Sequence, residues 1–538
     1  MHKILVIGGY GVFGKRICER LCRIPDIELV IAGRSVEKAQ SLVEQLKNAE
    51  CKLSAKAIDI NNIQNTDLGN VFALINASGP YHEQDYSVAE YCIENGVHYI
   101  DLADNREFVK GIAALDKTAK AKDVFVVSGA STVPALSSAV VDHFQEQFSE
   151  IHALDYGVTP GNQTDRGVGT VAAILSYVGK PFKTLIDGTS QRVYGWQNLH
   201  RTHYPAIGKR YMSNCDIPDL DLFQSRYPDL KTQRFYAGLE LGILHVGLWF
   251  LSWPSRWSWI KHPEKLAGVL RQVSLWFYPL GSDKGGMHVK IEGLDQDNKP
   301  LQTEWYLIAD EGDGPYIPAT PSVIIIKKLL NGSLKERGAV PCMGLFTLQE
   351  FMDEVCDLNI AQYTDEPLYV RYLKERYVQL PQAVQDLHNF DKEATYIGEC
   401  NVQRGANPFC KFVAWMMSLP PQGQGHKLKV HFKREGGAEH WTRHFGDKTF
   451  YSKQWDEGGT LYEQVNITTL AFDIDVSKEK LSLKLKQVYT LGIPVGWLFK
   501  PKVIAEESEQ SGKFRVNVEV HLLVFGLLVK YSGWLEKA

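Results

Sequence analysis

Near its start the chain reads Lys3-Ile4-Leu5-Val6-Ile7-Gly8-Gly9-Tyr10-Gly11-Val12-Phe13-Gly14, a stretch that decides the fold of the N-terminal domain. The apolar run 3–7 predicts a buried strand, and the spacing of apolar residues up to 23 predicts a helix after the glycines. The glycines fit the pattern G-x-G-x-x-G, which allows a tight turn, close approach of a diphosphate and close packing of helix on strand. The diphosphate is expected at the helix N-terminus, where free N–H groups and the helix dipole favour an anion.

A second motif overlaps this turn. Residues 9–15 also fit the phosphate-loop pattern G-x-x-x-x-G-K. That loop needs Ser or Thr at the next position to bind magnesium, and this chain has Arg16 there. The dinucleotide pattern is therefore favoured.

Apolar runs and helical segments alternate along the first 130 residues. Strands are predicted at 28–32, 52–58, 71–76, 98–102 and 124–128, and helices at 36–47, near Ile63, at 85–95 and at 107–121. This alternation predicts an α/β fold, a Rossmann-type doubly wound parallel sheet.

The end of the second strand bears on the choice of cofactor. An acidic residue there binds the ribose of NAD, whereas an Arg suits the 2′-phosphate of NADP. The chain has Ala32-Gly33-Arg34-Ser35 and no carboxylate, which favours NADP (NADPH) and makes NAD less suitable. Arg34 can bind a phosphate through two N–H groups, or it can simply be a surface charge beside the helix.

Two further turns follow strands, where ligands bind in such sheets. The first, at 76–81, has small residues that leave room for the nicotinamide half of the cofactor. The second, at 98–104, places Asp101 and Tyr99 near the same edge as candidate proton donors, with His98 beside them. The alternative, which we favour, is that Tyr99 and Asp101 only end the strand through hydrogen bonds.

The rest of the chain divides by its pattern. Residues 131–314 predict a second α/β (α+β) domain, with strands at 151–158, 287–293 and 301–309 and a helix at 170–177. Helices at 321–330 and 348–355, within 315–358, are expected to return to the first domain (1–130), with a small-molecule substrate in the cleft between domains. Short alternating strands in 359–538 predict a mainly antiparallel β domain, a sheet or barrel, with a helix at 409–417.

Three segments, 76–81, 92–102 and 129–134, resemble the NADP-binding domain of the saccharopine dehydrogenase family. The likeness extends through 281–286 and from 314 to 351. It implies an NADP-dependent oxidoreductase whose second domain binds substrate and often pairs subunits into a homodimer. The start and end of 359–538 resemble an uncharacterised bacterial domain that follows such reductases. Turn and resemblance together predict these cofactor-binding residues: Gly8, Gly9, Tyr10, Gly11, Val12, Phe13, Gly14, Arg34, Ser35, Asp59 near the adenine, Asn76, Ala77, Ser78 and Gly79.

Composition excludes several classes of protein. Of 538 residues, 59 are Lys or Arg and 63 are Asp or Glu, a net charge of −4 that disfavours nucleic acid as a partner. Nine cysteines without a C-x-x-C pair disfavour disulfides and zinc, and the short N-terminal apolar run is no signal peptide, so a cytoplasmic location is expected. His440 and His444 lie four apart on a predicted strand, ~13 Å, too far to share a metal with His431; no metal is predicted.

Residues 239–278 contain five of the twelve tryptophans. Trp249, Trp253 and Trp257 are spaced four apart and would share a helix face, although Pro254 argues against one unbroken helix. With the cations that come after them, this segment fits peripheral contact with the inner face of a membrane or a hydrophobic substrate pocket. It equally fits the core of the second domain or a dimer contact.

The sequence supports two functions. The first is an NADP(H)-dependent oxidoreductase that transfers a hydride to or from a C=N, C=O or C=C bond of a small or hydrophobic substrate. The alternative is a catalytically silent nucleotide-binding protein that binds a lipid-like ligand or a membrane surface.

Overall fold

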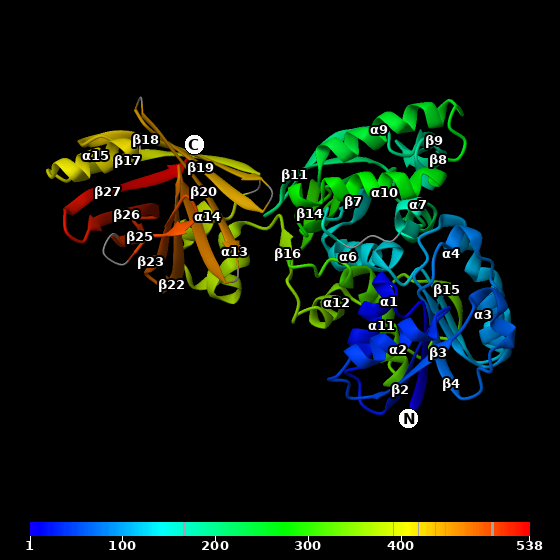
Figure 1. Cartoon of the computed structure of the whole chain (residues 1–538). Helices are drawn as coiled ribbons and strands as arrows, with labels where there is room; N and C mark the ends of the chain where they lie inside the picture. Colours follow the sequence, from blue (N-terminus) through cyan, green and yellow to red (C-terminus); the bar gives the residue numbers. More distant parts are fainter. Residues whose placement is uncertain are drawn as a thin grey trace. The chain divides into compact units, whose positions relative to one another are not determined.

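The computed structural model describes residues 1–164, 168–390, 392–417, 419–435, 437–446, 448–457, 459–496 and 500–538. The chain forms two compact units, Met1–Tyr363 (unit 1) and Thr364–Ala538 (unit 2), shown in Figure 1. Among the described residues, unit 1 holds two seven-stranded sheets and a separate two-stranded hairpin, and unit 2 holds one large sheet.

The N-terminal half of unit 1 is a seven-stranded parallel sheet in the order β15-β6-β5-β4-β1-β2-β3. The predicted Rossmann-type sheet is confirmed, and one strand that was not predicted, β15, extends it beside β6. The strands are β1 (His2–Ile7), β2 (Ile27–Gly33), β3 (Lys52–Ala57), β4 (Val71–Asn76), β5 (His98–Asp101), β6 (Phe125–Ser128) and β15 (Gly338–Pro341).

Helices α1 (Val12–Leu21), α2 (Val36–Gln45) and α3 (Ser87–Glu94) connect the strands as predicted, and the segment near Ile63 is a 3-10 helix, Ile60–Asn65. The helix predicted at 107–121 is wrong in one respect, because it is broken into α4 (Arg106–Gly111), a 3-10 turn and α5 (Asp116–Ala121). The Tyr86 hydroxyl donates to the Phe108 carbonyl oxygen at 2.8 Å and takes an acceptor that a continuous helix would use.

The second half of unit 1 is built on a mixed sheet in the order β10-β11-β12-β7-β13-β14-β16. β12 runs parallel to β7, whereas β13 is antiparallel to both β7 and β14, which confirms the predicted α/β (α+β) class. Its strands are β7 (Glu150–Thr159), β10 (His200–Tyr204), β11 (Gly208–Asn214), β12 (Thr232–Leu239), β13 (Gly285–Leu294), β14 (Pro300–Ala309) and β16 (Ile360–Thr364), with the hairpin β8 (Pro181–Ile186) and β9 (Thr189–Tyr194). The helices are α6 (Ser137–Phe144), α7 (Val168–Tyr177), α8 (Asp219–Arg226), α9 (Gly242–Arg256) and α10 (Ala267–Trp276).

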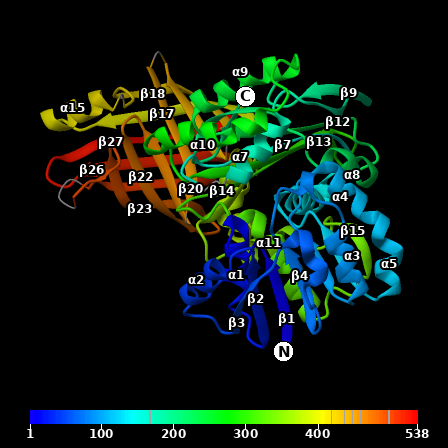
Figure 2. The same ribbon diagram turned by 45° about the vertical axis from the view of Figure 1, so that its right-hand side comes forward.

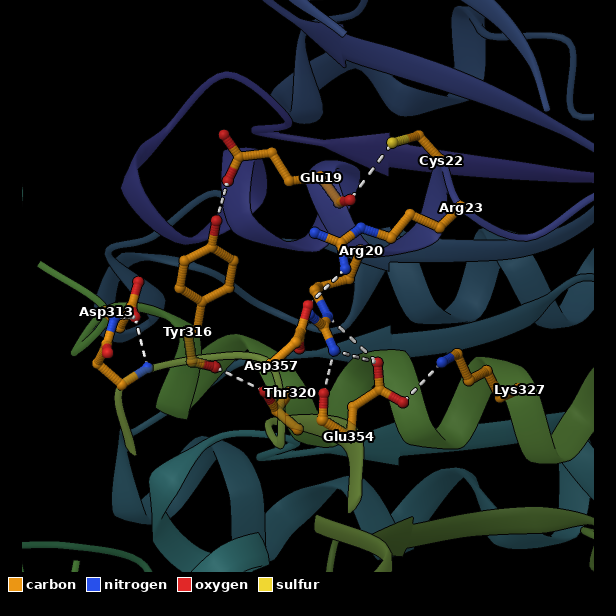
Figure 3. Close-up of polar contacts among 11 residues, drawn as sticks. Glu19, Arg20, Cys22, Arg23, Asp313, Tyr316, Thr320, Lys327, Glu354 and Asp357 are labelled. Atoms are coloured by element: carbon orange, nitrogen blue, oxygen red, sulfur yellow. Dashed lines mark hydrogen bonds and ion pairs between the residues drawn. The ribbon is translucent and has the colours of Figure 1, made fainter. Parts of the chain in front are cut away.

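After the mixed sheet the chain returns to the parallel sheet. α11 (Tyr316–Leu330) packs beside α1, β15 pairs with β6, and α12 (Leu348–Glu354) comes next. The polar contacts between α1 and this returning segment are drawn in Figure 3.

Unit 2 is a closed antiparallel barrel. Ten strands follow one another around the ring in the order β22-β21-β20-β19-β18-β17-β27-β26-β25-β23, and β22 pairs with β23 to close it (Figure 2). The predicted antiparallel β domain is confirmed. The ring consists of β17 (Glu393–Arg404), β18 (Gly423–Glu435), β19 (Ala438–Phe445), β20 (Lys448–Glu457), β21 (Thr460–Val465), β22 (Thr468–Val476), β23 (Lys480–Thr490), β25 (Lys502–Gln510), β26 (Lys513–Leu522) and β27 (Gly526–Lys537), with the short β24 (Ile493–Pro494) against β23.

In the described part of unit 2, three α-helices accompany the barrel, α13 (Leu368–Leu373), α14 (Gln382–His388) and α15 (Pro408–Met416), together with the 3-10 helix Lys374–Gln379. On the strands, His440 contacts the Tyr451 hydroxyl and His444 contacts Thr449. Within the described ranges, no three His, Cys, Asp or Glu side chains gather closely enough to hold a metal ion. None of the helices described, in either unit, has the length and apolar character needed to cross a membrane.

The tryptophan segment differs from the expectation of a broken helix. α9 continues through Pro254, because this proline lies in the last turn, where few helical hydrogen bonds remain to be lost. The tryptophans of the segment do not fill the core of its domain, because Trp257, Trp259 and Trp276 are exposed and Trp249 and Trp253 are half-buried. The residues of α9 that are buried are small or polar: His245, Ser252 and Ser255.

Candidate dinucleotide site

The turn between β1 and α1 is as tight as the glycine pattern predicts. Gly8 has a φ of +77°, which side chains disfavour, and a Cβ there would lie 2.8 Å from the carbonyl carbon of Ala77. A Cβ on Gly14 would overlap the Gly8 carbonyl oxygen. The Gly11 N–H donates to the same oxygen at 2.8 Å, so the loop folds back on itself and leaves no room for side chains.

The N-terminus of α1 is open to a ligand. Gly11 occupies the capping position and has no side chain with which to cap the helix, and the first helical hydrogen bond runs from the Lys15 N–H to the Gly11 carbonyl oxygen at 2.9 Å. Among the described residues, the N–H groups of Val12, Phe13 and Gly14 have no acceptor. This cradle fits the diphosphate of a dinucleotide, which needs such free donors and the positive end of the helix dipole.

The adenosine end of the predicted site lies after β2 and β3. The Ser35 N–H donates to the Tyr10 hydroxyl at 3.0 Å, which ties the glycine turn to β2. The Ser35 hydroxyl caps α2 and donates to Glu37 at 2.7 Å. Arg34 is exposed, and its guanidinium has no partner within the part of the chain that the structure describes. Arg34 is therefore free to meet a phosphate.

Asp59 follows β3 at the same edge. It caps the 3-10 helix that begins at Ile60, accepting from the Asn61 N–H at 3.1 Å and from the Asn62 side chain at 2.8 Å. Its side chain is exposed.

The Asn76 turn lies directly beside the glycine turn, since β4 pairs with β1 and the Ala77 N–H donates to the Ile7 carbonyl oxygen at 2.9 Å. Asn76 is buried. Its side-chain oxygen accepts from the Ser78 N–H at 3.1 Å and from the Ser78 hydroxyl at 2.6 Å, so Asn76 shapes the turn. Gly79 leaves open space, with only the Tyr81 ring near a Cβ built there.

One residue of this turn was missed in the sequence. Gln84 accepts from the Asn76 amide at 3.0 Å and donates to the Ser78 carbonyl oxygen, so it holds both ends of the turn. It comes after Pro80 in an irregular segment, where no spacing rule points to it.

Tyr99 and Asp101 are at the end of β5, as predicted, and both are fully buried. One Asp101 oxygen accepts from the Ala103 N–H at 3.0 Å, the Ser128 hydroxyl at 2.9 Å and the Gly129 N–H at 2.9 Å. Burial raises the pKa of the Asp101 carboxyl to about 6, and hydrogen bonds to the charged form limit the rise. The Tyr99 hydroxyl accepts from Asn76 at 3.3 Å. These contacts are those expected of residues that end the strand.

A partly buried ion cluster, with Arg20 and Glu354 at its buried centre, fixes the far end of α1 (Figure 3). Arg20 makes two hydrogen bonds to Asp357, at 2.7 and 2.9 Å, and its Nε donates to Glu354 at 3.3 Å. Lys327 on α11 also binds Glu354, at 2.6 Å, and Arg23 binds Asp357 at 2.7 Å. Hydrogen bonds from the two arginines lower the pKa of Asp357 to about 2 despite partial burial. The returning segment thus holds the helix whose N-terminus faces the ligand.

Parallel strands with a bare glycine turn at the first β–α connection define a dinucleotide-binding unit. Residues 4–127 match the family model of the saccharopine dehydrogenase NADP binding domain, and residues 380–535 match a domain of unknown function, DUF4166. The resemblance predicted from the sequence is confirmed for both segments. The first match supports a nicotinamide dinucleotide as the cofactor.

Two curated relatives are similar in the N-terminal part. Saccharopine dehydrogenase-like oxidoreductases from Rattus norvegicus and Mus musculus are 27% identical over 151 residues and 28% identical over 150 residues, covering 25% and 24% of this chain. The chain spans 35% of the length of each.

Solved structures are more distant. Apo saccharopine dehydrogenase (L-Glu forming) from Saccharomyces cerevisiae has 14% identity and a TM-score of 0.48, and covers 68% of this chain and 100% of its own. A meso-dapdh mutant from Clostridium tetani has 12% identity and a TM-score of 0.34, and covers 66% and 99%.

Proposed function

We propose that this protein is an NADP(H)-dependent oxidoreductase of the saccharopine dehydrogenase type. The cofactor, when bound, supplies the hydride chemistry, and the substrate is a small or hydrophobic molecule with a C=N, C=O or C=C bond. The observation that carries the proposal is the glycine turn. Its backbone lets a diphosphate approach closely, and the free N–H groups at the start of α1 can bind that diphosphate. We place the protein in the cytoplasm, which suits its nine free cysteines.

The preference for NADP rests on Arg34. Its exposed, unpartnered guanidinium comes after Gly33 at the end of β2, the position that recognises the ribose substituent. The nearest carboxylate in sequence, Glu37, accepts a hydrogen bond from Ser35. A phosphate on the 2′ position would gain a charged bidentate partner in Arg34, whereas NADH would gain none.

Titration of the purified chain with NADPH and NADH, followed by the fluorescence of the bound nicotinamide, tests this proposal. Arg34→Ala should weaken NADPH binding by ~10-fold and leave NADH binding unchanged. Lys38→Ala is the matched control, because Lys38 is another exposed cation on the following helix. A wild-type protein that binds neither nucleotide would overturn the proposal.

A second candidate function rests on the surface of α9 and α10. We propose that this surface docks on an anionic lipid bilayer. Both helices pack on one small apolar cluster with α7, and they lie along the same side of unit 1 in Figures 1 and 2. Ile243, Phe250 and Trp257 recur every seven residues on the exposed face of α9, and Val269 and Trp276 do so on α10.

Polar side chains on the buried side of α9 attach this helix to the rest of its domain. His245 bonds to Ser213 at 2.8 Å and accepts from the Leu239 N–H at 3.2 Å, and Ser255 donates to the Val178 carbonyl oxygen at 2.7 Å. Trp257, Trp259 and Trp276 are exposed, Trp259 at 78%, and the cations Lys261 and Lys265 lie between the helices. Exposed aromatic rings flanked by cations suit the interface of an anionic bilayer.

Flotation with phosphatidylglycerol vesicles and with phosphatidylcholine vesicles tests the docking surface. The wild type should float with the anionic vesicles, and the triple variant Trp257→Ala, Trp259→Ala and Trp276→Ala should not. Val378→Ala, which removes an exposed apolar side chain from unit 2, is the control. A wild type that does not float but forms a dimer, which the triple variant breaks, would show that a second copy covers this surface and would contradict the proposal.

A further inference from the structure

The barrel of unit 2 is hollow. It encloses a cavity of ≈ 350 Å³, lined by side chains from around the ring and from α15. The interiors of eight-stranded barrels are just filled by side chains or hold one small ligand, and the width grows with strand number. A ring of ten strands therefore leaves room, and this volume falls within the range of small-molecule sites, roughly 300 to 1,000 Å³.

The lining is built by alternation along the strands, most regularly on β26. On β26, Phe514, Val516, Val518, Val520 and Leu522 all face the cavity. The residues between them are polar: Arg515, Asn517, Glu519 and His521. Apolar side chains that line an empty space destabilise a fold, because they lose packing partners. An apolar occupant would supply the missing packing partners, so the lining suits an apolar ligand.

A polar wall interrupts this lining on the side of β19 to β21. The Arg443 side chain is only 11% exposed, donates to the Ser452 hydroxyl at 2.7 Å and lies 4.7 Å from the centre of the Trp441 ring. Its ion pair with Glu463 is long, 3.4 Å. Among the described residues these are its polar partners, so the guanidinium keeps N–H donors for an acceptor on a ligand.

Two other polar groups of the lining, Glu507 and Gln454, are already engaged as acceptors. The Glu507 carboxylate is 2.6 Å from His388, which is fully buried, and Gln454 accepts from the Tyr369 hydroxyl at 3.0 Å. Arg443 is therefore the cation best placed to hold the polar end of a ligand whose remainder is apolar.

One end of the cavity is covered by α15 and by the turn between β26 and β27. Phe409, Val413 and Met416 of α15 line the cavity, and the Phe409 ring packs on Phe525 of the turn, with ring centres 4.2 Å apart. Both elements also expose large apolar side chains to solvent: Phe412, Trp415, Leu523 and Val524. Because the cover is apolar on both sides, this end of the barrel suits the entry of a long hydrocarbon chain.

We infer that the barrel binds a fatty acyl ligand, a single long hydrocarbon chain in the lumen with its polar end beside Arg443 and its entry beneath α15. The inference is independent of the dinucleotide site, which lies in unit 1. A fatty acid and a neutral lipid carry the same hydrocarbon chain and differ at the polar end. Comparing the binding of the two therefore shows which polar end the site accepts.

The test uses the full chain, stripped of lipid on a hydrophobic resin. cis-Parinaric acid, whose fluorescence rises in apolar sites, should saturate the protein at one molecule per chain, and oleate should displace it. Val518→Phe, which fills the lumen, should weaken binding by ~10-fold or more. Asn517→Phe, the neighbouring outward position, should bind as the wild type does.

Arg443→Met tests the polar end. This variant should weaken oleate by ~10-fold and leave oleyl alcohol unchanged if the ligand is an acid, and should weaken both if Arg443 binds any acceptor. Circular dichroism and NADPH binding control for folding of the two units. Failure of the wild type to bind either probe, or equal binding by a folded Val518→Phe variant, would overturn the inference.

Discussion

Strand β1 of the parallel sheet and strand β26 of the barrel are both rich in apolar side chains, yet they use them differently. In β1, Ile4 and Val6 join the core on one side of the sheet, while Leu5 and Ile7 join the core on the other. In β26 every second residue is apolar and faces a cavity. A sheet filled on both faces can accept a ligand only at its strand ends, whereas a closed sheet with one apolar face can accept it inside.

The largest expected effect is on stability, and it distinguishes the filled core of the parallel sheet from the hollow barrel. Ile31→Ala opens a cavity in a fully buried position of β2 and should lower the free energy of unfolding of unit 1 by about 2 to 5 kcal/mol. Val518→Ala only widens an existing cavity and should cost the barrel about 1 kcal/mol or less. Hydrogen exchange of peptides from each unit, in rising urea, measures both; equal costs would contradict the comparison.

A smaller effect concerns the strand-end site alone. Gly14→Ala places a Cβ on the Gly8 carbonyl oxygen, which must open the turn, so NADPH binding should weaken by ~100-fold, or ~2.7 kcal/mol. Gly247→Ala is the control, because a Cβ there meets nothing within 4 Å. Binding of parinaric acid by the barrel should be the same in both variants; a loss of it in Gly14→Ala would mean that the two sites are not independent.

The smallest effect is electrostatic and belongs to unit 1. The pKa of Asp357 falls from 3.8 to about 2 on folding, so its contribution is present above pH 4 and is lost as the pH falls from about 4 to about 2. Because its side chain is 43% exposed, solvent screening should limit this contribution to about 1 kcal/mol. Asp357→Asn should lower the stability of unit 1 at pH 7, and the difference from the wild type should shrink towards pH 3.

Urea unfolding monitored by hydrogen exchange at pH 7, 4 and 3 gives that difference, with the barrel peptides as the internal reference. A difference that stays constant over this pH range would assign the effect to packing instead of charge.

The sequence predicted most of the parallel sheet because each strand is a continuous apolar run between turn residues. It did not reveal β15, since Gly338–Pro341 is only four residues long and its partner β6 lies two hundred residues earlier. Strand β25 also lacks a regular apolar alternation, since its run of charged residues buries only Ala505 and Glu507. Pairing with the distant β6 makes β15 a strand, and pairing with β26 and β23 makes β25 one.

Part of the candidate cofactor site could be predicted from the sequence. The glycines stand in a motif whose spacing has a steric cause, and Arg34 follows the end of the second strand, so both could be placed at one edge of the sheet from the sequence. The orientation of α9 could not be inferred, because its apolar residues surround it and the buried side is held by His245, Ser252 and Ser255. A prediction from hydrophobicity alone would have placed the tryptophans in the core.

Strand β15, the last to join the parallel sheet, has a consequence for the biosynthesis of the chain. β6 acquires its outer neighbour, and Arg20 its carboxylate partners, only from residues after 337. A chain of only the first 130 residues would therefore have a sheet with a bare edge at β6, and its Arg20 would lack the two carboxylates that pair with it. This sheet should reach its final form only after two thirds of the chain has been translated, so a fragment ending at residue 130 would be a poor substitute for the intact unit.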